Sequence, residues 1–148
     1  MPSRVLTGLA IALVLSTACA TAHGGMEPSA RASESATLAQ IYFWRAKLDR
    51  VADYTRYVRE VAEPIDREAQ RSDAFLSVTT YQSADSTVPW THMRVFLLRD
   101  SAQWRGLAAA LTAAGTRLEP DSLRRHERST YGASLRDPAG STLVRLVR

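Results

Sequence analysis

The sequence has 148 residues, of which 45% are hydrophobic and 23% are charged, the balance of an ordinary globular chain. This length suits one domain once the N-terminus is discounted. The formal net charge is +4, but acidic residues are interleaved with the arginines along the whole chain. No block of five or more like charges marks a nucleic-acid-binding tail, so we expect no nucleic-acid partner.

The N-terminus has the order of a secretory signal peptide. Arg4 precedes the apolar run 5–15, which is too short to span a bilayer as a helix, and small residues follow it. The stretch "LSTAC" at residues 15–19 resembles a bacterial lipobox, in which the cysteine carries the lipid and becomes the first residue of the mature protein. This resemblance implies that residues 1–18 are lost and that Cys19 is lipidated.

Two further observations favour the lipobox over ordinary secretory cleavage, which could use the small residues around Ala20. Cys19 is the only cysteine, so it has no partner for an intramolecular disulfide. Residues 20–37 are small and polar, which is typical of a flexible tether. We therefore expect a lipidated cysteine and tether at 19–39, an α+β domain at 40–148, and a membrane-anchored location in the bacterial cell envelope. Ordinary cleavage would instead leave a periplasmic or secreted protein.

The first half of the domain predicts a strand and then a helix. Residues 40–47 are aromatic and β-branched, which favours a strand. Asp49 stands where a helix N-cap would, and Pro64 is expected to kink or split the helix that follows. Apolar residues recur at helical spacing on one expected face, namely Val51, Tyr54, Val58, Val61 and Ile65.

Two strands and a second helix come next. Residues 74–82 and 90–98 are expected to be strands joined by a hairpin loop. Asp100 and Gln103 have the spacing of a capping box that begins a helix, and Gly115 is expected to end it. The expected apolar face of this helix comprises Trp104, Leu107, Ala108 and Leu111. We expect Trp104 to lie in the core.

The C-terminal part predicts a loop and a hairpin. Residues 119–128 are expected to be a loop with one helical turn, in which the run "RRHER" at 124–128 is a solvated turn in preference to an anion site. Residues 129–136 and 141–148 are expected to be strands around "DPAG", whose residues favour a turn.

The predicted order is strand, helix, strand, strand, helix, strand and a terminal strand. It indicates an α+β fold of the split βαβ type, an antiparallel sheet with two helices on one face. The first and third strands are then central, and both are apolar on both faces. Because the helices cover one face, the other needs a cover, and a second copy of the sheet is the simplest one.

The segments "IYFWRAKLDRVADYTRYVREVAEPIDRE" (41–68) and "RVFLLRDSAQW" (94–104) resemble the dimeric α+β barrel superfamily, a ferredoxin-like group. That group includes cofactor-free monooxygenases, haem-degrading enzymes, small-molecule-cyclising enzymes and many domains of unknown activity. The resemblance spans about residues 40–148 and implies the fold and a homodimer. It includes no catalytic signature, so it implies no particular activity.

Candidate chemistry centres on His92. The histidines at 23, 92 and 126 lack the spacing of a metal site, and the domain has no cysteine, so we expect no metal and no cofactor. The expected ligand-binding wall around His92 comprises Tyr42, Trp44, Trp90, His92, Arg94 and Phe96. In one interpretation these rings hold a planar ligand, His92 acts as a base and Arg94 binds an anion. In the other, His92 and Arg94 are structural polar residues at a dimer interface.

Two functions follow from these alternatives. We expect a non-enzymatic domain that binds a small ligand or a partner, because large side chains at Tyr42, Trp44 and Phe96 fill the strand faces. The alternative is a cofactor-free monooxygenase-like enzyme that acts on a small planar substrate, with His92 as its weak catalytic candidate.

Overall fold

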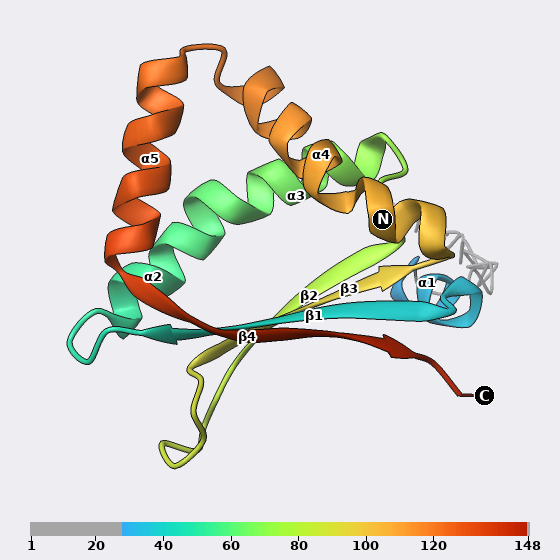
Figure 1. Cartoon of the computed structure of the whole chain (residues 1–148), viewed down its shortest axis with the longest axis horizontal. Helices are drawn as coiled ribbons and strands as arrows, with labels where there is room; N and C mark the ends of the chain where they lie inside the picture. The colour runs from blue at the N-terminus through green and yellow to red at the C-terminus, as the bar shows by residue number, and fades with distance from the viewer. Residues whose placement is uncertain (1–27, 148) are drawn as a thin grey trace, which may run out of the picture.

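The computed structural model describes residues 28–147, which follow the predicted split βαβ order (Figure 1). The helices are α1 (Pro28–Ser35), α2 (Val51–Tyr57), α3 (Glu63–Arg71), α4 (Ser101–Leu118) and α5 (Ser122–Ser134), with a π-helical turn η1 (Val58–Ala62) between α2 and α3. The strands are β1 (Leu38–Ala46), β2 (Ser77–Gln82), β3 (His92–Leu98) and β4 (Arg136–Arg145). Among the described residues, no helix combines the length and the apolar character needed to cross a bilayer.

The strands form one antiparallel sheet in the order β2-β3-β1-β4, so β1 and β3 are central, as predicted. The register places Ile41 opposite Val95 and Tyr42 opposite Arg94. Helices α2 to α5 lie on one face of this sheet (Figure 1). Side chains at even-numbered positions of β3 face these helices and are buried, whereas those at odd-numbered positions face away and are half-buried.

The folded domain extends further towards the N-terminus than residue 40. Residues 28–39, which we predicted as part of a flexible tether, include α1 and the first two residues of β1. Thr37 bridges two strands, because its N–H donates to the carbonyl of Leu98 (2.9 Å) and its carbonyl accepts from the N–H of Leu146 (3.0 Å). Cys19 and the predicted signal peptide lie outside the described residues.

The predicted helix after β1 is divided into three consecutive segments. We had predicted Asp49 as the N-cap, but the N-cap is Arg50. The Arg50 Nε donates to Asp53 in the first turn at 2.8 Å. Pro64 has no backbone donor, and the turn before it widens into η1. The predicted interruption at this proline is therefore confirmed as a π-helical turn.

This wide turn rotates the buried face of the helix. Tyr54 and Val58, before and at the start of η1, are 2% and 3% exposed, as the periodicity predicted. Beyond η1, Asp66 and Ala69 are the buried residues, whereas Ile65 is only half-buried. An apolar pattern of constant period cannot anticipate a turn that takes up more residues than an α-helical one.

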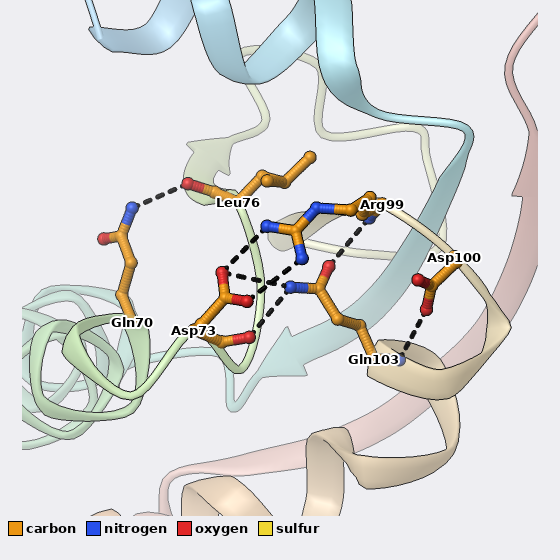
Figure 2. Close-up of polar contacts among 6 residues, drawn as sticks. All are labelled: Gln70, Asp73, Leu76, Arg99, Asp100 and Gln103. Carbon is orange, nitrogen blue, oxygen red and sulfur yellow. Dashed lines mark hydrogen bonds and ion pairs between the residues drawn. The ribbon is translucent and has the colours of Figure 1, made fainter.

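A polar cluster ties the end of α3 to the start of α4 (Figure 2). Asp100 caps α4 as predicted, accepting from the N–H groups of Ala102 (2.8 Å) and Gln103 (3.0 Å). Asp73, whose φ of 55° lies in the left-handed region, accepts two 3.0 Å hydrogen bonds from the Arg99 guanidinium. The Gln103 side chain donates to the carbonyl of Asp73 (2.8 Å) and accepts from the N–H of Arg99 (2.7 Å).

The apolar face of α4 is narrower than predicted. Leu107 is buried and Leu111 is half-buried, but Ala108 is exposed. Trp104, which we predicted in the core, is 41% exposed, and its indole N–H donates to Oε1 of the buried Gln40 at 2.9 Å. These predictions fail because α4 packs mainly against α3, so few of its side chains reach the sheet.

The chain after α4 differs most from the prediction. Gly115 does not end α4, which continues through Leu118, and the predicted loop and first hairpin strand form α5. Asp121 is the N-cap of α5, and its Oδ1 accepts from the N–H groups of Leu123 (2.8 Å) and Arg124 (3.2 Å). The helices α4 and α5 diverge from their connection as two arms of a V (Figure 1).

The predicted turn at "DPAG" is a β-bulge within β4, so the predicted pair of C-terminal strands is wrong. Phe43 pairs with Gly140 and Trp44 pairs with Pro138, so the residue of β4 between Pro138 and Gly140 has no partner in β1. Pro138 lacks a backbone donor but is tolerated because β4 is an edge strand. Gly140 adopts a φ of 121°, which glycine readily takes. Turn-forming residues therefore bend one strand here and do not reverse the chain.

The layer between the sheet and the helices contains two apolar clusters. The larger includes Leu38, Ala69, Phe75, Phe96, Leu98, Leu107 and Ala114. The smaller includes Ala46, Tyr54, Val58 and Leu135. Polar side chains are also buried within the described chain, namely Gln40, Asp66, His92 and Arg94.

Candidate ligand-binding site

A cleft of about 680 Å³ opens between η1, α3, α4 and α5 on the helix side of the sheet. Apolar and small residues contribute much of its wall, among them Val61, Pro64, Ile65, Leu111 and Gly115. The volume is in the ordinary range of small-molecule sites.

A smaller pocket of about 150 Å³ adjoins this cleft. The two share Tyr57, Ile65, Leu111 and Arg136 in their walls. Residues of the sheet and of α2 to α3 complete the inner pocket, namely Trp44, Tyr54, Ala62, Asp66 and Arg94. The inner pocket therefore lies towards the sheet, and we call both together the helix–sheet cleft.

Close packing of α5 against α2 positions one side of this cleft. A Cβ atom at Gly132 would lie 2.3 Å from Cζ of Tyr57, so only glycine allows α5 to approach this ring. On the same helix, the Tyr131 ring contacts the Tyr57 ring at a centroid distance of 6.3 Å. The C-terminal end of α5 is thereby fixed beside α2, and β4 begins two residues later.

Arg136, the first residue of β4, lies in the wall of both pockets. Its guanidinium lies over the rings of Trp44 and Tyr54, with the Cζ atom 4.7 and 5.3 Å from their centroids. Its Nε is buried without a hydrogen-bond partner. Within residues 28–147, no carboxylate forms an ion pair with this guanidinium.

Arg94 brings a second guanidinium to the inner pocket. It forms a buried ion pair with Asp66 of α3, and the two side chains are only 9% and 4% exposed. The Cζ of Arg94 lies 5.3 Å from the centroid of the Phe96 ring. Its Nε has no hydrogen-bond partner. Burial lowers the pKa of Arg94, and the nearby side chains of Tyr54 and Glu63 partly oppose this shift.

The two tyrosines of the cleft are proton donors at neutral pH. Burial raises the pKa of Tyr54 to about 12, and burial also raises the pKa of Tyr57. Both hydroxyls therefore stay protonated, and each can donate a hydrogen bond to a bound molecule.

His92 lies outside the walls of the helix–sheet cleft and is only 1% exposed. Its Nε2 is 3.0 Å from the hydroxyl of Thr55, and its Nδ1 is 3.0 Å from the hydroxyl of Thr91. The Thr55 hydroxyl donates to the carbonyl of Val51 (2.9 Å), so its oxygen can accept the Nε2 proton. Burial lowers the pKa of His92, which favours a neutral imidazole. This arrangement favours the structural interpretation of His92.

The structure brings two of the six predicted wall residues, Trp44 and Arg94, to the cleft. Tyr42 and Phe96 instead pack in the larger apolar cluster, with ring centroids 5.9 Å apart.

Trp90, which we predicted in this wall, lies outside it. It precedes β3, so the alternation of that strand does not govern its side chain, and its ring contacts Phe43 of the opposite sheet face at 5.8 Å. Arg136, Tyr54 and Tyr57 were not predicted as cleft residues. An N-cap signal at "PDS" (120–122) would have predicted α5 and, with it, the position of Arg136 at the start of the next strand.

No protein-family model matches this sequence, and no curated protein matches it. The crystal structure of HapK from Hahella chejuensis is similar to this chain with a TM-score of 0.52 and 10% identity, over 74% of this chain and 92% of HapK. The chain has a ferredoxin-like α+β fold. At this identity the likeness shows the fold alone.

Two further crystal structures resemble the chain more weakly. A monooxygenase candidate from Shewanella loihica PV-4 has a TM-score of 0.47 and 15% identity, over 76% of this chain and 96% of its own. A dimeric ferredoxin-like protein from an uncultured marine organism has a TM-score of 0.47 and 10% identity, over 76% of this chain and 89% of its own.

In the described part of this chain, no group of three His, Cys, Asp or Glu side chains is placed to hold a metal ion.

We predict that His92→Ala destabilises the fold by about 1–3 kcal/mol, because it removes a buried ring that contacts two hydroxyls. His126→Ala is the matched control, since His126 is exposed on α5 and its loss should cost no more than about 0.5 kcal/mol. Urea denaturation measures both changes. Equal stability of the two variants would contradict a structural role for His92.

The same residue predicts a pH dependence. Because burial lowers the pKa of His92 from its ordinary 6.5, the unfolded chain binds the proton more readily than the folded one. Stability should therefore fall as the pH drops below about 6.5, and part of that slope should be absent from His92→Ala. The side chains that contact the imidazole, Tyr54, Thr55 and Thr91, are uncharged at this pH.

Proposed function

We propose that this protein is a non-enzymatic domain that binds a small planar molecule in the helix–sheet cleft. The observation that carries the proposal is the inner wall of that cleft, where the Arg136 guanidinium lies over the rings of Trp44 and Tyr54 and the Tyr57 ring lines the same pocket. Flat aromatic rings suit planar ligands, and the adjoining outer cleft provides room for a molecule larger than a single ring.

The titratable groups of the cleft favour binding over proton transfer. A cofactor-free oxygenase needs a base within reach of its substrate. His92 is enclosed by Thr55 and Thr91, and Asp66 is held in an ion pair with Arg94. Glu60, at the outer wall, is exposed to solvent and lies away from the aromatic inner pocket. The cleft therefore offers surfaces and hydrogen-bond donors to a ligand more than a base.

We predict that Gly115→Leu blocks binding of planar molecules. A Cβ at Gly115 would meet Ile65 at an ordinary 3.7 Å, so the backbone tolerates a side chain there, and a leucine would extend into the cleft. Gly106→Leu on the same helix is the matched control, because a Cβ there meets nothing within 4 Å. Both variants replace a glycine inside a helix, and this replacement stabilises the helix by up to about 1 kcal/mol.

The probes are 2-naphthoate and its uncharged analogue 2-naphthamide, with binding followed by saturation-transfer NMR. We expect the parent chain and Gly106→Leu to bind at least one probe, and Gly115→Leu to bind neither. The proposal fails if the parent chain binds neither probe, or if the two leucine variants bind equally well.

We also propose that two copies associate through the sheet face that α2 to α5 leave open. Its central residues are apolar and only half-buried in one copy, namely Ile41, Phe43, Met93, Val95 and Leu97. Tyr81 of β2 pairs with Met93 and is 48% exposed. A second copy of this apolar face would remove it from water.

Val95→Asp should convert the dimer to a monomer, because Val95 lies on a central strand and a carboxylate there would be buried without a partner. Thr112→Asp on the exposed side of α4 is the control and should leave the association unchanged. Sedimentation velocity measures the mass of each. A monomeric parent chain at micromolar concentration would contradict the proposed dimer.

Export and membrane anchoring complete the proposal and rest on the lipobox resemblance at residues 15–19. We predict that Cys19→Ala moves the protein from the detergent-extracted membrane fraction to the soluble fraction, since no thiol remains for acylation. The circular dichroism spectrum should not change. Absence of labelled fatty acid from the parent protein, with the same partitioning in both forms, would exclude lipidation.

A further inference from the structure

We infer that the ligand of the helix–sheet cleft is a planar organic anion whose carboxylate, or a similar acidic group, binds the edge of the Arg136 guanidinium. This inference rests on the proposed function and adds the charge and orientation of the ligand. It depends on how Arg136 is held.

Arg136 contacts aromatic rings but no hydrogen-bond acceptor. Its Cζ atom lies over the rings of Trp44 and Tyr54, which gives the cation two aromatic contacts. The N–H groups point outward along the edge of the plane, and they form no hydrogen bond or ion pair within residues 28–147. The Nε–H is buried, and a buried N–H without a partner is costly. A carboxylate can accept from this group and from a neighbouring N–H of the same guanidinium at once.

The other cations of the cleft are already neutralised or occupied. Arg94 pairs with Asp66, and Arg128 pairs with Glu119 at 3.3 Å. Arg125 donates to the carbonyls of Glu119 and Pro120, both at 2.7 Å. Arg136 is therefore the guanidinium of this cleft that has neither a carboxylate nor a carbonyl partner in the described chain, and an anion is the complementary ligand.

Neighbouring groups fit the same ligand. Tyr57 is in the wall of both pockets, and its protonated hydroxyl can donate a hydrogen bond to an acidic group beside Arg136. The inner pocket of about 150 Å³ has room for an acidic group and part of a ring system, and the outer cleft can take the remainder. A carboxylate attached directly to a flat ring fits this order.

The experiment compares 2-naphthoate with 2-naphthamide, which has the same shape and no charge, by isothermal titration of the full chain. We expect the parent to prefer the naphthoate by about tenfold or more, and high salt to reduce that preference. Arg136→Gln should lower naphthoate affinity by about 10- to 100-fold and leave naphthamide affinity nearly unchanged. Arg105→Gln, which makes the same change of charge on an exposed part of α4, should alter neither.

A second variant does not depend on the folding of Arg136→Gln. Glu60 lies in the outer wall without an ion-pair partner in the described chain, so Glu60→Gln should raise naphthoate affinity and leave naphthamide affinity unchanged.

Equal affinities of the parent for the two probes would overturn the inference while leaving a planar-ligand site in place. Failure of both probes to bind would instead overturn the proposed function. If Arg136 serves only as a structural contact, Arg136→Gln loses stability without any change in the preference for naphthoate.

Discussion

The ion pair between Arg94 and Asp66 is the constraint on which the arrangement of this protein depends. It joins the central strand β3 to α3 and sits in a layer that otherwise consists mainly of apolar side chains. Removing two charges from water is expensive, so such a pair is weak evidence for added stability, but loss of either partner would strand a buried charge. Because both groups must be kept together, the register of α3 on the sheet is restricted. The two apolar clusters and the inner pocket are arranged around this point.

Arg136 gives the same region an excess of positive charge. One carboxylate, Asp66, faces two guanidiniums in the inner pocket, and it is committed to Arg94. The aromatic rings of Trp44 and Tyr54 hold the second guanidinium but cannot satisfy its N–H groups. A site that carries an unsatisfied charge in the absence of its ligand is less stable than it could be, which is common where binding requires it.

Much of the fold follows from local signals in the sequence. The aromatic β1, the apolar β3 and the Asp100 cap depend on residues close together in the chain, and each was predicted. The bulge at Pro138 was not, because the same residues favour a turn unless an edge strand and a partner strand accommodate them. The candidate site was predictable only in part, at Trp44 and Arg94. Its other half depends on α5 and on the contact of Gly132 with Tyr57, which joins residues far apart in sequence.

Aromatic rings lie on both faces of this sheet, so a planar anion could in principle contact either face. We propose that it binds between the sheet and the helices. The most direct measurement is a set of isotope-filtered NOEs between bound 2-naphthoate and the labelled full chain. The account predicts NOEs to the ring protons of Tyr57 and Trp44. NOEs to Phe43 and Trp90, whose rings contact each other on the opposite face, would contradict it.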